Sequence, residues 1–93
     1  MKIVINRCFG GFSLSEKAYE FLGKEWDSYG YEFNEHRTDP QLVECVEKLG
    51  DEANGRCARL KVIEIPDDVK WDIYNYDGLE FVYDVERVWG MGG

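Results

Sequence analysis

The sequence predicts an α+β domain in which two helices lie on one face of a small, mostly antiparallel sheet. Three observations carry this prediction: a β-branched opening segment, two segments with helical spacing of apolar residues, and an Asp-Gly pair between two alternating apolar segments. In chain order the elements are strand, helix, helix, strand, strand and strand, which makes about four strands in all. We expect residues 1–93 to form a single domain, because a chain this short cannot divide its core in two.

The first strand and the first helix are predicted from residues 2–23. The segment KIVINRC alternates β-branched side chains on both faces, which is typical of a strand that lies inside a sheet. Ser13 and Glu16 then have the spacing of a capping box, so we expect a helix from about residue 14 to about residue 23, ended by Gly23. The apolar face of this helix would consist of Leu14, Ala18, Phe21 and Leu22.

A polar, aromatic loop and a second helix follow. We expect the loop to include a short strand around Tyr31 and Phe33. Thr38 or Asp39 would cap a helix that Pro40 opens, because proline is favoured in the first helical turn. Asn54-Gly55 would end this helix in the left-handed conformation. Its apolar face would consist of Leu42, Val46, Leu49 and Ala53.

The last third of the chain is predicted to be β structure. Residues 58–65 alternate and then shift phase, which indicates a strand with a bulge near Val62. Asp77-Gly78 lies between two alternating segments and predicts a hairpin. A helix over residues 79–89 is the competing interpretation, and we prefer the hairpin because of its β-branched and aromatic content. The two hairpin strands would carry Val69, Trp71, Ile73, Leu79, Phe81, Tyr83 and Val85.

Composition excludes several classes of protein and of site. Apolar residues make up 44% of the chain and aromatic residues 15%, as in a folded domain. No apolar segment is long enough for a membrane helix, and the opening residues are too short and too alternating for a signal peptide, so we expect a cytoplasmic protein. Cys8, Cys45 and Cys57 are widely spaced, which predicts reduced, mostly buried thiols and no zinc site. The single histidine, His36, lies in a polar segment and is expected on the surface, so we expect no metal and no cofactor.

The net charge of −8 is unevenly distributed. Residues 1–31 carry four basic and four acidic side chains, and residues 32–93 carry seven basic and fifteen acidic ones. A chain without a basic stripe is not expected to bind duplex nucleic acid. The acidic part would suit a basic protein partner, and solubility alone is the other explanation of it.

The turn between the first strand and the first helix is the candidate ligand site. The first N–H groups of a helix lack partners within the helix, and glycines let a ligand approach the backbone. Arg7 would add a positive charge, and Arg37 would bring a second one or pair with Glu35. A tight turn with two core phenylalanines is the structural alternative. The candidate ligand-binding residues are Arg7, Phe9, Gly10, Gly11, Phe12, Ser13, Ser15 and Arg37.

A candidate partner surface lies in the hairpin region. Residues 71–89 contain more aromatic side chains than one face of a short hairpin can bury, so some of these side chains are expected to be exposed. Asp67, Asp68, Tyr74 and Tyr76 are the candidate contact residues. We expect no enzymatic activity, because no nucleophile stands beside a candidate base; Cys8 at the mouth of the turn is expected to be inert.

Four segments, MKIVINRCFGGFSLSEKA, RTDP, ANGRCARLKVIEIPDDV and YDGLEFV, resemble a family of small proteins widespread in tailed bacteriophages, most of them without an assigned activity. The resemblance spans nearly the whole chain and implies a phage protein at work in the bacterial cytoplasm. The family often has a histidine where this sequence has Glu86, before Arg87, so no role of that histidine is carried over. The resemblance supplies context, since small non-structural phage proteins often act on host processes or defences.

Two functions follow from these observations. The first is a phage counter-defence protein that sequesters a nucleotide-like immune signal at the Gly10-Gly11 turn without breaking a bond, and that forms a homo-oligomer. The second is an acidic inhibitor that mimics nucleic acid and covers a basic surface of a host defence or nucleic-acid-processing enzyme. The sequence slightly favours the first, because the neutral, glycine-bearing part has local features that solubility does not require.

Overall fold

The computed structural model describes residues 1–85. The expectations that concern residues 86–93, such as those for Arg87 and Trp89, lie outside the described residues. The fold is α+β and follows the predicted order of elements. The chain forms β1 (Lys2–Asn6), α1 (Glu16–Leu22), α2 (Pro40–Leu49), a 3-10 turn η1 (Gly50–Ala53), β2 (Leu60–Glu64), β3 (Trp71–Tyr76) and β4 (Leu79–Asp84). Within the described part of the chain, no helix is long and apolar enough to cross a membrane.

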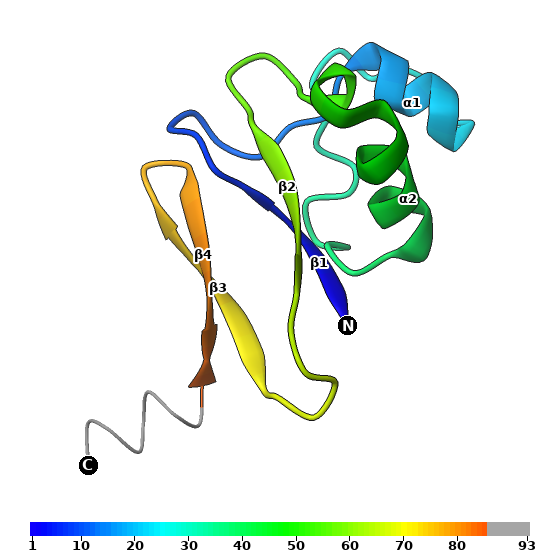
Figure 1. Ribbon diagram of the computed structural model, residues 1–93. Coiled ribbons are helices and arrows are strands. Elements are labelled where there is room, and N and C mark those ends of the chain that lie inside the picture. Colours follow the sequence, from blue (N-terminus) through cyan, green and yellow to red (C-terminus); the bar gives the residue numbers. More distant parts are fainter. Residues whose placement is uncertain (86–93) are drawn as a thin grey trace.

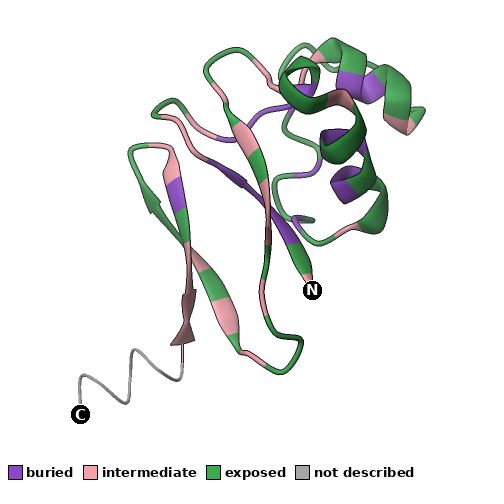
Figure 2. Cartoon of the chain, viewed as in Figure 1, coloured by how far each residue is buried: buried purple, intermediate pink, exposed green. Residues whose placement is uncertain are grey.

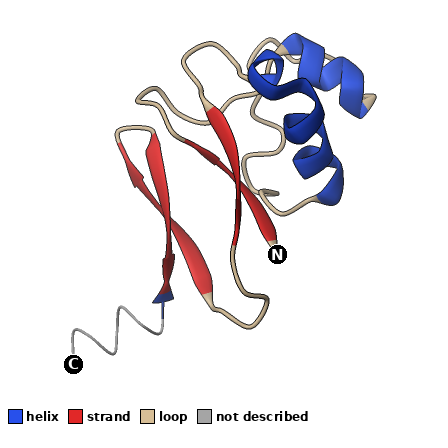
Figure 3. Cartoon of the chain, in the orientation of Figure 1, coloured by secondary structure: helices blue, strands red, loops and turns tan. Residues whose placement is uncertain are grey.

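The four strands form two antiparallel pairs (Figures 1 and 3). β1 pairs with β2, and β3 pairs with β4 across the Asp77-Gly78 turn, which confirms the predicted hairpin. β1 lies near β4, but within residues 1–85 it is hydrogen-bonded as a strand to β2 alone. The opening strand was expected inside a single sheet of about four strands and is instead an edge of a two-stranded pair. Each residue from Lys2 to Asn6 faces one residue of β2, so the bulge predicted near Val62 is wrong.

The hydrophobic core lies between the β1–β2 pair and the helices (Figure 2). α2 packs on both strands, and α1 packs on α2 and η1. Val4 points into this core, whereas its neighbours Ile3 and Ile5 point to the other side and are buried as well. The core consists of Val4, Phe12, Leu14, Ala18, Tyr19, Phe33, Leu42, Val43, Cys45, Val46 and Ala53. We call the elements from β1 to β2 the body and the β3–β4 pair the hairpin.

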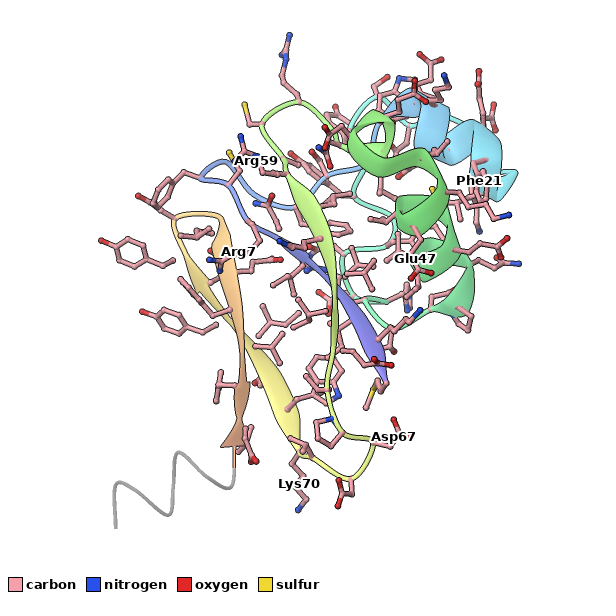
Figure 4. The ribbon with its side chains drawn as sticks, in the orientation of Figure 1. Arg7, Phe21, Glu47, Arg59, Asp67 and Lys70 are labelled. Carbon is pink, nitrogen blue, oxygen red and sulfur yellow. The ribbon has the colours of Figure 1, made fainter. Side chains whose placement is uncertain are left out.

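The first helix is shorter than predicted, and its cap is different. Ser15, not Ser13, is the N-cap: its hydroxyl oxygen accepts a hydrogen bond from the Ala18 N–H. The Ser15 hydroxyl also donates to the Glu52 carbonyl oxygen of η1, whereas Ser13 is buried. Gly23 ends the helix in the left-handed conformation as predicted. Phe21, expected on the apolar face, points outward and is exposed (Figure 4), and Tyr19 is buried in its place.

The second helix ends earlier than predicted. Asp39 caps it and Pro40 opens it as expected, but the α-helix stops at Leu49 and continues as η1. The helix is followed by Gly50, which has a positive φ of 59° but not the left-handed helical conformation. Asn54, predicted to be left-handed, is extended, and its side chain accepts a hydrogen bond from the Leu60 N–H. The strand expected around residues 31–33 is replaced by turns.

A buried ion pair joins the hairpin to the body. Arg37 and Glu80 are 7% and 2% exposed, and two guanidinium nitrogens of Arg37 donate to the two carboxylate oxygens of Glu80 at 2.6 and 2.8 Å. The backbone N–H of Asn6 donates to the same carboxylate at 2.7 Å. β1 and β4 are not joined by a ladder of backbone hydrogen bonds, so the Glu80 carboxylate makes the connection between them.

Arg37 also closes the free edge of β1. Its carbonyl oxygen accepts a hydrogen bond from the Val4 N–H, and its guanidinium donates to the Val4 carbonyl oxygen. The guanidinium lies 3.8 Å from the ring centre of Phe12 and donates to the carbonyl and side-chain oxygens of Asn34. Arg37 was predicted to contact a ligand or to pair with Glu35, and its partner is Glu80 instead.

We expect Glu80→Ala to lower the free energy of unfolding by about 3–5 kcal/mol, because it leaves the Arg37 charge and the Asn6 N–H buried without a partner. Urea denaturation followed by circular dichroism measures the loss. Glu25→Ala removes an exposed carboxylate and is expected to change stability by less than about 0.5 kcal/mol. A cost for Glu80→Ala as small as this control would show that the pair does not hold the hairpin.

Candidate functional site

The two glycines of the predicted ligand site contact the hairpin turn. The Gly10 N–H donates to the Asp77 carbonyl oxygen at 3.2 Å. Gly10 and Gly11 have φ of 137° and 97°, and a side chain at Gly78 would collide with the backbone nitrogens of both. The close backbone approach predicted for a ligand is therefore made by the β3–β4 turn.

Most donors expected to hold an anion have protein partners. The N–H groups of Leu14 and Ser15 donate to the carbonyl oxygens of Gly30 and Ala53. Arg7 donates to the Glu80 carbonyl oxygen at 2.7 Å. Ser13 and Phe12 are buried, and the Arg37 guanidinium is fully engaged. These residues lie close together as predicted, and in this structure they connect the body to the hairpin.

A hollow of about 460 Å³ does border the two glycines. Its lining includes two carboxylates and no lysine or arginine, which disfavours a phosphate there. The lining residues are Gly10, Gly11, Phe12, Tyr31, Asn34, Glu35, Asn75 and Glu80.

The outer face of the hairpin is aromatic and exposed. Tyr74 and Phe81 are direct cross-strand partners, 55% and 42% exposed. Tyr76 continues this face and meets the ring of Phe9 edge to face, with ring centres 6.4 Å apart; each is 59% exposed. The guanidinium of Arg7 lies 4.6 Å from the ring centre of Phe81, and Figure 4 shows Arg7 between β1 and the hairpin. We call Phe9, Tyr74, Tyr76 and Phe81 the aromatic patch.

The four predicted partner residues do not gather at one place. Tyr74 and Tyr76 belong to the aromatic patch, near the Asp77-Gly78 turn. Asp67 and Asp68 are exposed in the β2–β3 loop, at the opposite end of the hairpin, and Asp67 pairs with the amino group of Met1 (Figure 4). Phe81 belongs to the aromatic residues of which some were expected to be exposed, but it was not singled out, and Phe9 was assigned to the ligand site. The alternation of β4 places Phe81 on the face opposite Glu80.

A groove of about 420 Å³ runs between β3 and residues 34–38. The Arg37–Glu80 pair is part of its lining, and Trp71 and Ile73, which were predicted on one face of the strand, line it from β3. Across from β3, Glu35 is exposed and makes no hydrogen bond or ion pair with the residues described here. The groove lining is Asn34, Glu35, Arg37, Thr38, Trp71, Asp72, Ile73, Asn75 and Glu80.

The part of the loop that precedes this wall of the groove is organised around Asp27. Its carboxylate accepts hydrogen bonds from the N–H groups of Gly30 and Tyr29, and these donors hold its pKa below the usual value. The hydroxyl of Tyr19 also donates to it, and burial raises the pKa of that hydroxyl to about 12. The loop is thus fixed by hydrogen bonds, although much of its surface is exposed.

The three cysteines and the single histidine lie in different environments. Cys45 is buried, and burial raises the pKa of its thiol to about 11, as suits a core residue. Cys8 is half-buried and Cys57 exposed, so the prediction of mostly buried thiols holds for Cys45 alone. His36 is exposed as predicted. Residues 1–85 contain no group of side chains that could hold a metal ion.

Comparisons of this chain with models of protein families, with curated proteins and with solved structures find no match. The geometry of the hairpin and the groove is therefore the basis on which a function can be inferred.

The contact between the glycine turn and its neighbours makes Gly10 more sensitive than Gly11. Both have positive φ, but a methyl group at Gly10 would lie 2.5 Å from the Cys57 Cβ, whereas one at Gly11 would meet nothing within 4 Å. We expect Gly11→Ala to cost about 1–2 kcal/mol of backbone strain and Gly10→Ala about 1–3 kcal/mol more. Urea denaturation of both variants tests this, and equal costs would contradict the packing of this turn.

Acid is expected to weaken the Asp27 loop. Because the folded-state pKa of Asp27 is depressed, its contribution to stability is present above the unfolded value of 3.8 and is lost as the pH falls through the lower, folded-state pKa. We expect Asp27→Asn to lower the free energy of unfolding at neutral pH. We also expect the free energy of unfolding of this variant to fall less than that of the wild type between about pH 5 and about pH 2. Urea denaturation across this range measures the slope.

Tyr19→Phe serves as the matched control, because it removes one donor to Asp27 and leaves both backbone donors in place. It should keep most of the acid dependence. A slope unchanged in Asp27→Asn would show that other groups cause the acid loss.

Proposed function

We propose that this chain is a non-catalytic binding module that engages a basic protein through its hairpin. The observation that carries the proposal is the aromatic patch, in which Tyr74, Tyr76, Phe81 and Phe9 expose contiguous ring surface on one face. Exposed aromatic clusters of this kind are typical of protein interfaces, where tyrosine and other large rings supply much of the binding energy.

The charge of the hairpin region as a whole indicates the chemistry of the partner, although Arg7 lies over Phe81 in the patch itself. Residues 66–85 carry six acidic side chains and one lysine, and only Glu80 among these acids is buried in an ion pair with Arg37. Asp72 and Asp77 flank the patch on β3 and in the turn. A basic surface would therefore be attracted to the hairpin and held there by the rings.

Sequestration of a nucleotide-like signal has less support. The glycine turn is in contact with the hairpin, and the hollow beside it carries carboxylates where a phosphate would need cations. Because the sequence resembles tailed-phage proteins, we propose that the partner comes from the bacterial host. It would be a bacterial protein with a basic face, such as the nucleic-acid channel of a defence or nucleic-acid-processing enzyme, bound in the bacterial cytoplasm.

The proposal is tested by capture and by measured affinity. Wild-type protein and a Tyr74→Ser, Phe81→Ser variant are immobilised and exposed to bacterial extract. A captured protein is purified and titrated against each by calorimetry. We expect a basic protein whose affinity falls by about tenfold or more in the variant and declines as salt is raised.

The matched control is Phe21→Ser, Tyr29→Ser, which removes two exposed rings from α1 and the following loop, away from the hairpin. It should bind like the wild type. Equal binding by the hairpin variant would contradict the proposal. A nucleotide adduct that appears in native mass spectra of the wild type and disappears in Gly11→Glu would favour sequestration. Light scattering of the wild type and of the hairpin variant would show whether a homo-oligomer forms and whether it uses the same patch.

A further inference from the structure

β3 is an edge strand with a groove beside it. Within residues 1–85, β3 pairs with β4 alone, and no other strand lies on its second edge. In a hairpin closed by a two-residue turn, the residues that flank the turn exchange backbone hydrogen bonds, and the bonded pairs then alternate along the strands. Tyr76, Tyr74 and Asp72 therefore bond to β4, and the backbone groups of Asn75, Ile73 and Trp71 point away from it.

One of these outward backbone groups, the Ile73 N–H, is hydrogen-bonded to a side chain of β3 itself. The Ile73 N–H donates to the Oδ1 atom of Asp72 at 2.7 Å, a bond that is possible only because this N–H is not used by β4. A local carboxylate on an edge strand blocks pairing with another chain, in the way that charged residues protect the edges of natural sheets. Asp72 is exposed, so this block can be displaced.

The groove lies along the same three residues. Trp71, Ile73 and Asn75 line it from β3, and Asn34, Glu35 and Thr38 line it from the loop. The loop side thus offers an amide, a hydroxyl and a carboxylate to whatever extends along the strand. Glu35 and the acidic hairpin favour basic side chains in that position.

We propose that an extended, basic segment of the partner adds to β3 as a further strand, with its backbone bonded to Trp71, Ile73 and Asn75 and its side chains reaching the aromatic patch and the groove. This mode of binding rests on the proposed function and specifies how the hairpin engages its partner. Backbone bonds along the edge supply affinity, and pockets for alternate side chains supply specificity. The carboxylate of Asp72 must leave the Ile73 N–H before the strand can pair.

The experiment uses the whole chain and a short synthetic peptide of alternating lysine and valine. Nuclear magnetic resonance titration follows the backbone amides of the protein. We expect saturable shifts centred on Trp71, Ile73 and Asn75, and slower hydrogen exchange at these amides. The same peptide methylated on alternate backbone nitrogens cannot form the ladder and should cause no such pattern.

Asp72→Ala gives the decisive comparison, because the two explanations predict opposite signs. Strand addition predicts tighter peptide binding by about three- to fivefold, since the Ile73 N–H is released. Attraction by charge alone predicts weaker binding, since a carboxylate is lost. Asp68→Ala removes an equal charge from the β2–β3 loop, away from the edge, and should weaken binding by about twofold at most.

Weaker binding in Asp72→Ala, or the absence of shifts at the three amides, would overturn the inference. The proposed function is judged separately by the Tyr74→Ser, Phe81→Ser variant. If that variant loses the captured protein while the peptide fails to pair with β3, the hairpin is the binding surface and strand addition is not its mode of binding.

Discussion

The carboxylate of Glu80 is the group on which the arrangement of this protein depends. It accepts hydrogen bonds from Arg37 and from the backbone of Asn6, and so it connects the hairpin, the loop after α1 and the edge of β1 in one buried place. Asn6 adds to the same connection, because its side chain donates to the carbonyl oxygens of Cys8 and Gly78. Since these groups are shielded from water, each relies on the others for its partner. We call this set of hydrogen bonds among Glu80, Arg37 and Asn6 the joint. Loss of one of the three side chains is expected to destabilise the contact between the hairpin and the body.

This joint lies on the inner face of the hairpin and leaves the rings of the outer face exposed. The inner face is fixed by Glu80, whereas the outer face carries the aromatic patch and the second edge of β3 has no strand beside it among the described residues. The core between the β1–β2 pair and the helices supplies the stability of the body without these exposed rings. The proposed binding would therefore use side chains other than those of the core, and the hairpin can expose apolar rings without loss of core packing.

The sequence was sufficient for local elements and insufficient for contacts between distant ones. The Asp77-Gly78 turn and the Asp39-Pro40 helix start were predictable, because backbone geometry alone selects those residues. The N-cap was misplaced because Ser13 has capping-box spacing to Glu16, whereas Ser15 is followed at that distance by Ala18. The hydrogen bond from Ser15 to the Glu52 carbonyl oxygen of η1 comes from a distant turn and has no local sequence signal. The glycines signalled unusual backbone, but the sequence does not say that the β3–β4 turn lies against them. Glu80 gave no signal, because a glutamate in an alternating strand has the same pattern whether it faces water or a buried arginine.

The position of Glu80 near the end of the described chain has a consequence for synthesis on the ribosome. Glu80 and its partner Asn6 are 74 positions apart, and all the elements of the body precede the hairpin in the chain. Domains acquire structure from the N-terminus as they emerge, and a lone two-stranded hairpin is only marginally stable in water. Asn6 and Arg37 are therefore synthesised before the glutamate that joins them. The open edge of β3 and three of the four rings of the patch belong to the hairpin, so they are exposed on an unfinished chain for a shorter time than if the hairpin came first.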